Sequence, residues 1–121
     1  MNNLYHLGLI IAAGIGVLHF YVLFLEMFRW DTAGPRVFGM APEQLHHTRL
    51  LAANLGLYNG FLGGGLLWGA SLGAAGLPTL TYFLGCVATA GLYAARRVRK
   101  TFWVQTFPAA LALACLWIGR S

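Results

Sequence analysis

Polar side chains that interrupt long apolar runs are the residues of this sequence best suited to chemistry. His19 and Glu26 lie seven residues apart in the first run, which is about two helical turns. That spacing would place them about 10 Å apart on nearly the same helix face. A carboxyl group with a histidine behind it can act as a general base or relay a proton. The structural alternative pairs Glu26 with Arg29 at the membrane interface and leaves His19 as a hydrogen-bonded core residue.

Further polar residues recur in the other apolar runs, all toward the same side. Because a strongly polar side chain inside hydrocarbon is costly, it usually marks a functional site. We predict a single pocket that is formed by Glu26, Asn54, Tyr58, Tyr93 and Gln105. The candidate catalytic residues are Glu26, His19 and Tyr93. The candidate substrate-binding residues are Asn54, Tyr58, Asn59, Gln105 and Arg99.

The segment Glu43-x-x-His46-His47 has the Glu and His spacing that some helical two-metal proteins use. No second Glu-x-x-His motif accompanies it, and a solvated helix end would contain the same residues. We therefore predict no metal site.

Composition places these residues in a membrane protein. Of the 121 residues, 59% are hydrophobic and 9% are charged, whereas a soluble domain carries about 25% charged residues. The net charge is +5, but the basic residues fall between apolar runs. A nucleic-acid surface would need them as a stripe on a soluble face. We therefore exclude a soluble two-domain protein and a nucleic-acid partner, and expect membrane lipids as partners.

The apolar runs predict an all-α fold. Each is close to the roughly 20 residues that cross the hydrocarbon core of a bilayer, and backbone groups in lipid must be paired within the segment. Short connections at 73–76 and 96–101 make successive helices antiparallel neighbours. The expected fold is one integral membrane domain over 1–121, an up-down four-helix bundle with helices at about 4–28, 42–72, 77–95 and 102–119. The long first connection contains turn residues at Gly34-Pro35, and Pro42 suits a helix start.

The distribution of basic residues predicts an orientation. Only Arg120 of the eight Lys and Arg residues lies outside the first and third connections and their flanks. The positive-inside rule then places both termini on the non-cytoplasmic side of a bacterial inner membrane. Trp30 and Trp103 would anchor the cytoplasmic interface.

Small residues recur at intervals of four, which lets helix backbones approach closely. The stripes are Gly8, Ala12 and Gly16 in the first helix, and Ala52, Gly56, Gly60 and Gly64 in the second. They are suited to packing within the bundle or to a subunit interface.

Three strings carry a resemblance to a known family. They are His19-Phe-Tyr with Phe24-Leu-Glu-Met-Phe-Arg-Trp, then Asn54-Leu-Gly-Leu-Tyr-Asn-Gly-Phe-Leu, and Gln105-Thr-Phe-Pro-Ala. Over nearly the whole chain the sequence resembles the domain-of-unknown-function family number 1304. That resemblance implies a four-helix membrane architecture and no defined activity.

A more distant resemblance is to the membrane-associated proteins in eicosanoid and glutathione metabolism, the MAPEG family. Asn54 matches the Asn of that family's Arg-x-x-x-Asn-x-x-Glu pattern, and Tyr58 matches an adjoining Tyr of some members. The resemblance implies a homotrimer with pockets between subunits in the cytoplasmic half. Leu50 and Leu57 stand at the Arg and Glu positions that help to bind glutathione. The cofactor therefore stays unknown, with glutathione as the candidate that the resemblance offers.

Three functional hypotheses stay open from the sequence. The first is a MAPEG-like membrane protein, an enzyme or a binder of a lipophilic or thiol-bearing small molecule, with a polar pocket in the cytoplasmic leaflet. The second is a small proton-coupled transporter that uses Glu26. The third is a structural or accessory protein whose polar residues only join helices.

Overall fold

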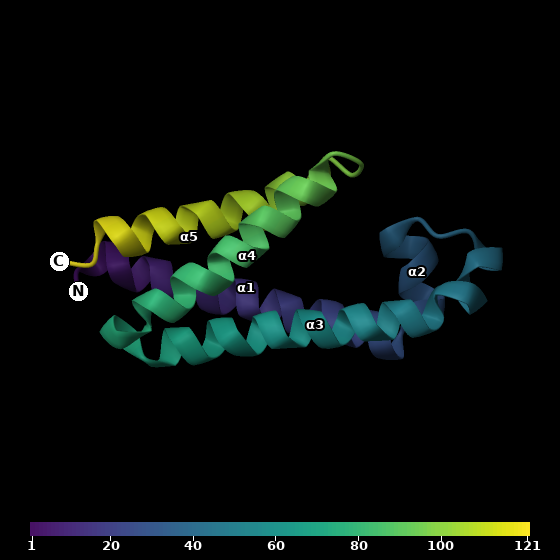
Figure 1. Cartoon of the computed structure of the whole chain (residues 1–121), viewed down its shortest axis with the longest axis horizontal. Coiled ribbons are helices and arrows are strands. Elements are labelled where there is room, and N and C mark those ends of the chain that lie inside the picture. The colour runs from purple at the N-terminus through teal and green to yellow at the C-terminus, as the bar shows by residue number, and fades with distance from the viewer.

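A computed structural model describes all residues, 1–121, and it is entirely helical (Figure 1). The five α-helices are α1 (Asn3–Phe28), α2 (Trp30–Phe38), α3 (Leu45–Ser71), α4 (Leu77–Ala95) and α5 (Phe107–Ile118). Short 3-10 turns at Pro42–Gln44 and Gly73–Gly76 precede α3 and α4, and a π-helical turn at Phe102–Thr106 leads into α5. The all-α prediction is confirmed.

The first connection differs from the sequence prediction, because it contains the helix α2 where only turns were expected. Pro35 lies inside this helix, and Gly39 ends it with φ of 69°. Two contacts stabilise the helix. Within α2 the Trp30 ring lies 5.3 Å from that of Phe38, and the Trp30 indole donates a hydrogen bond of 3.1 Å to Thr48 Oγ1 of α3. A β-carbon on Gly34 would overlap the Leu45 side chain, so the glycine permits close packing of α2 on α3.

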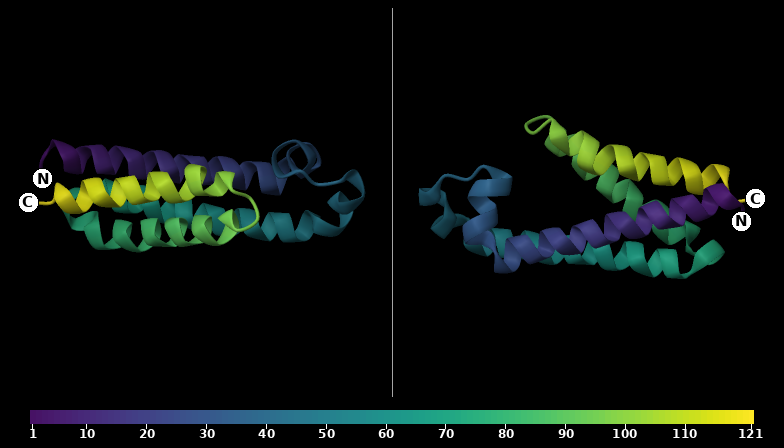
Figure 2. Two further views of the ribbon diagram at one scale, coloured as in Figure 1. Left: turned by 90° about the horizontal axis from the view of Figure 1, so that it is seen from above. Right: turned by 180° about the vertical axis from the view of Figure 1, so that it is seen from behind.

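Successive long helices run in opposite directions, and the connections gather at two ends (Figures 1 and 2). The termini lie together, where the Asn2 amide donates a hydrogen bond of 3.3 Å to the Gly119 carbonyl. The Tyr5 hydroxyl adds a 2.8 Å bond to the Gly73 carbonyl at the same end. Helix α2 and the connection 96–101 lie at the other end, where α4 and α5 diverge from the α1 and α3 pair.

Three helical segments are long and apolar enough to cross a membrane: Asn3–Phe28, Pro42–Ser71 and Gly73–Ala95. The apolar segment Phe102–Ile118 is shorter and rises about 25 Å, against about 30 Å of hydrocarbon. Large apolar side chains such as Ile10, Phe61 and Tyr82 are exposed on the outer surface. The structure therefore has the character of a membrane protein with at least three candidate spans.

Close packing of α1 on α3 depends on the glycine stripes. A β-carbon on Gly16 would lie 3.1 Å from the Gly63 carbonyl oxygen, and one on Gly60 would overlap Leu23. Gly8 packs in the same way against Leu116 of α5. Gly8, Gly16 and Gly60 of the stripes thus serve packing within the chain, whereas a β-carbon on Gly64 would meet only the Phe20 ring, at 3.9 Å.

Candidate functional site

Two of the candidate site residues, Glu26 and Asn59, are in contact between α1 and α3. The Glu26 side chain is only 6% exposed, and Asn59 Nδ2 donates a hydrogen bond of 2.7 Å to its Oε1. Asn59 Nδ2 also donates to the Leu55 carbonyl at 3.1 Å, which orients the amide. Gly56 makes the contact possible, because a β-carbon there would lie 3.3 Å from Cβ of Glu26. The alternative that paired Glu26 with Arg29 is wrong, since the sole ion pair joins Arg49 to Asp31.

His19 is a buried residue with a local partner. It is 2% exposed, and its Nδ1 lies 2.8 Å from the Ile15 carbonyl oxygen one turn earlier. Nδ1 must therefore carry the proton in this bond. This is the structural alternative that the sequence offered for His19, a hydrogen-bonded residue of the core.

The other predicted site residues lie on separate surfaces. Asn54 and Tyr58 are exposed on α3, and the Tyr58 ring stacks edge-on against Phe61 at 5.6 Å. Tyr93 is 67% exposed on α4, with the Arg96 guanidinium 4.2 Å from its ring centroid. Gln105 is half-buried in the π-helical turn, and Arg99 is exposed in the connection 96–101. Of the candidate site residues, the single chain brings only Glu26 and Asn59 into contact.

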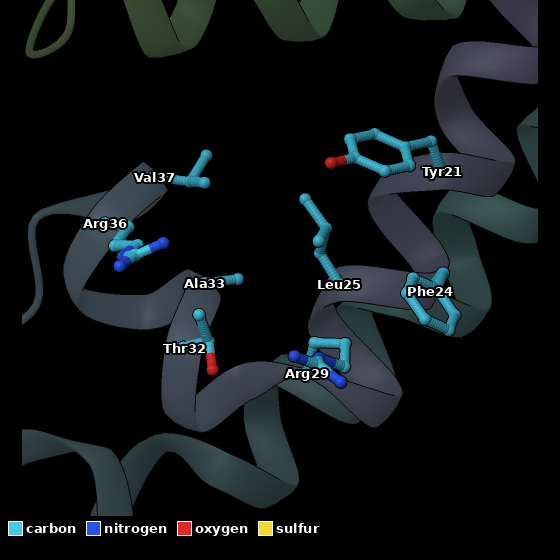
Figure 3. Close-up of a pocket in the computed structure, with 8 residues that line it drawn as sticks. All are labelled: Tyr21, Phe24, Leu25, Arg29, Thr32, Ala33, Arg36 and Val37. Carbon is cyan, nitrogen blue, oxygen red and sulfur yellow. The ribbon is translucent and has the colours of Figure 1, made fainter.

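A concave site that the sequence did not predict lies where α1 meets α2 (Figure 3). We call it the α1–α2 hollow, and its volume is about 390 Å³. Its lining residues are Tyr21, Phe24, Leu25 and Arg29 from α1 and its end, and Thr32, Ala33, Arg36 and Val37 from α2. Each helix supplies apolar side chains, such as Leu25 of α1 and Val37 of α2, and polar ones, such as Arg29 at the end of α1 and Arg36 of α2.

Local sequence places the polar groups of the hollow. Tyr21, Leu25 and Arg29 follow at intervals of four, so they share one face of α1. Arg29 is the C-cap residue of α1 and the N-cap residue of α2, and Arg36 lies in the last turn of α2. The sequence shows the spacing of Tyr21, Leu25 and Arg29, but it does not predict the residues opposite them, because those residues belong to α2.

A second concave surface lies on the outer face of α4. It is wide and shallow, with a volume of about 760 Å³. Its lining residues are Thr81, Tyr82, Gly85, Cys86, Thr89, Ala90 and Tyr93. No charged residue lines it, so it is suited to contact with lipid tails or another helix.

Comparison with known protein families shows which family the chain belongs to. The family model described as "Protein of unknown function (DUF1304)" matches residues 4–117. The chain belongs to this family. It is also similar to a protein named Uncharacterized protein YpaA of Lactococcus lactis subsp. lactis (strain IL1403), with 30% identity over 90 residues that cover 72% of this chain and 76% of that protein. No solved structure matches the chain significantly.

Proposed function

We propose that this DUF1304 protein binds a small lipophilic molecule in the α1–α2 hollow. The observation that carries the proposal is that apolar side chains, including Leu25 and Val37, and the polar side chains of Arg29, Thr32 and Arg36 line one cavity. Its volume falls within the roughly 300 to 1,000 Å³ that small-molecule sites have. Five of its eight lining residues are hydrophobic, and small-molecule sites combine such residues with placed polar groups.

The site belongs, in this proposal, to the cytoplasmic leaflet. Support comes from the two connections that gather at one end, 29–44 and 96–101, which carry or adjoin every basic side chain except Arg120. Basic residues concentrate in cytoplasmic connections. Both termini would then face away from the cytoplasm.

The proposal is limited to binding because the buried polar residues already have structural partners. Glu26 accepts from Asn59, and His19 bonds to the Ile15 carbonyl, so neither needs a reaction to account for its position. The Glu26–Asn59 bond joins α1 to α3. A MAPEG-like homotrimer would add walls from neighbouring subunits, and it is a further proposal that rests on the resemblance alone.

Filling the hollow tests the proposal. We expect at least one of three amphiphiles of equal chain length, dodecanol, laurate and dodecyl phosphate, to bind saturably to the protein in phosphatidylcholine nanodiscs. Val37→Trp should weaken binding by about tenfold or more, because the larger side chain would occupy space that the tail needs. Scintillation proximity measurements with tritium-labelled amphiphiles would give the dissociation constants.

A matched control is available in the connection 96–101. Val98 is 45% exposed and Val37 is 46% exposed, but Val98 does not line the hollow. Val98→Trp should therefore bind as the unmodified protein does. Equal weakening by both substitutions, or no saturable binding of any of the three amphiphiles, would contradict the proposed function.

A further inference from the structure

We propose that the α1–α2 hollow selects a ligand whose head is an oxyanion, a phosphate or a carboxylate, attached to an acyl or alkyl tail. This inference rests on the proposed function and names the ligand class of the same site. Arg29 and Arg36 hold the head, and the apolar side chains of Phe24 and Leu25 contact the start of the tail.

The head group site consists of donors with no partner in the chain. The side chains of Arg29 and Arg36 line the hollow, and neither of them forms a side-chain hydrogen bond or ion pair within the protein. In Figure 3 the Tyr21 hydroxyl points from α1 toward α2, where Val37 and Arg36 lie on the far side of the hollow. Guanidinium groups match the geometry of phosphate and carboxylate with paired hydrogen bonds.

No acidic residue neutralises these arginines. The chain has only three acidic residues. Asp31 pairs with Arg49 at 2.6 Å, and Glu26 is buried against Asn59. Glu43 lies in the 3-10 turn before α3 and forms no ion pair. An anionic ligand would supply the negative charge that these arginines lack within the chain, and basic pockets between membrane helices are suited to anionic head groups.

The tail direction follows from the course of α1. Tyr21 precedes Arg29 by eight residues, so it lies about 12 Å farther along the helix toward the interior of the span. Phe24 and Leu25 lie between these two levels and line the hollow. A head at Arg29 and Arg36 would thus send its tail along hydrocarbon side chains into the bilayer. The arrangement fits an amphiphile better than a free inorganic anion.

Removing the two charges provides the test. We expect the unmodified protein in phosphatidylcholine nanodiscs to bind laurate or dodecyl phosphate at least about tenfold more tightly than dodecanol, because charge-assisted hydrogen bonds form only with the acids. The double variant Arg29→Gln/Arg36→Gln should lose that preference while retaining whatever affinity it has for dodecanol. Glutamine keeps donors and much of the length of arginine, and both residues are exposed, so the fold should persist.

The matched control removes the same net charge from the same end of the molecule. Arg97→Gln/Lys100→Gln alters the connection 96–101, outside the hollow, and should retain the preference for the acids. Equal losses in the two double variants would mean general charge attraction and would overturn the inference. If dodecanol binds as tightly as the acids and Val37→Trp weakens both, the ligand class is wrong while the proposed function stands. If nothing binds saturably, both fail.

A competition experiment distinguishes the two sources of the oxyanion, a membrane phospholipid and a free fatty acid. Nanodiscs that contain phosphatidic acid at a tenth of the lipid should compete with dodecyl phosphate if the head belongs to a membrane phospholipid. Laurate should compete more strongly than phosphatidic acid if the ligand is a free fatty acid. Either result supports an oxyanion head at Arg29 and Arg36. Failure of both acids to compete would overturn it.

Discussion

Replacing Asn59 with leucine is expected to lower the free energy of unfolding by about 2 to 3 kcal/mol, because the buried carboxyl group of Glu26 would lose its donor. The Asn59 amide is the side-chain partner of Glu26, at 2.7 Å, and it joins α3 to α1. Loss of a partner costs more than the hydrogen bond itself, since the remaining polar group stays away from water. Unfolding in nonionic detergent with increasing dodecyl sulfate would measure the change.

Two further variants identify the cause. Asn54→Leu removes an exposed amide of the same helix and should change stability by less than about 0.5 kcal/mol. Glu26→Leu/Asn59→Leu removes both polar partners and should recover most of the loss, because no buried group is then left unpaired. A double variant that is less stable than Asn59→Leu alone would show that the contact is not the source of the effect.

Gly63→Ala is the second substitution with a large expected effect, a loss of about 1 to 3 kcal/mol from overpacking. A β-carbon at this position would lie 2.8 Å from the Gly16 carbonyl oxygen and 2.8 Å from the Phe20 ring. The Phe20 side chain can rotate, but the Gly16 backbone cannot, so α1 and α3 would have to separate. Thermal unfolding followed by circular dichroism in detergent would report the loss.

Gly14→Ala is the control for that substitution. A β-carbon on Gly14 would meet no atom within 4 Å, and alanine favours a helix over glycine by up to about 1 kcal/mol. This variant should be unchanged or more stable. Equal destabilisation by the two changes would mean that helix contact does not require glycine at Gly63.

The sequence predicted the long helices well because their signal is local. Uninterrupted apolar runs and short connections define the segments, and Pro42 begins the 3-10 turn before α3 as its position suggested. Helix α2 gave no such signal, because Gly34 and Pro35 are typical of turns. It is stabilised by contacts of Trp30 with Thr48 and of Gly34 with Leu45, which only the folded chain brings together.

The candidate site was predicted less well because depth along a helix does not determine direction around it. Asn54 and Asn59 were assigned to the same polar set, but five residues rotate a helix by about 140°. Asn59 therefore faces Glu26 on α1, whereas Asn54 is exposed. Arg36 was read only as an orientation signal, since its role as a wall of the hollow depends on α2. The predicted and observed sites therefore differ for two reasons: the direction of each side chain around its helix, and the presence of α2.

Photolabelling would show directly whether the α1–α2 hollow is the binding site. Laurate with a diazirine in its tail would be bound to the protein in phosphatidylcholine nanodiscs, irradiated, and located by peptide mass spectrometry. We expect labelled residues between Tyr21 and Val37. Unlabelled laurate should displace the label, and the Val37→Trp variant should be labelled less. Displaceable labels on the outer face of α4, between Thr81 and Tyr93, would contradict the proposed site.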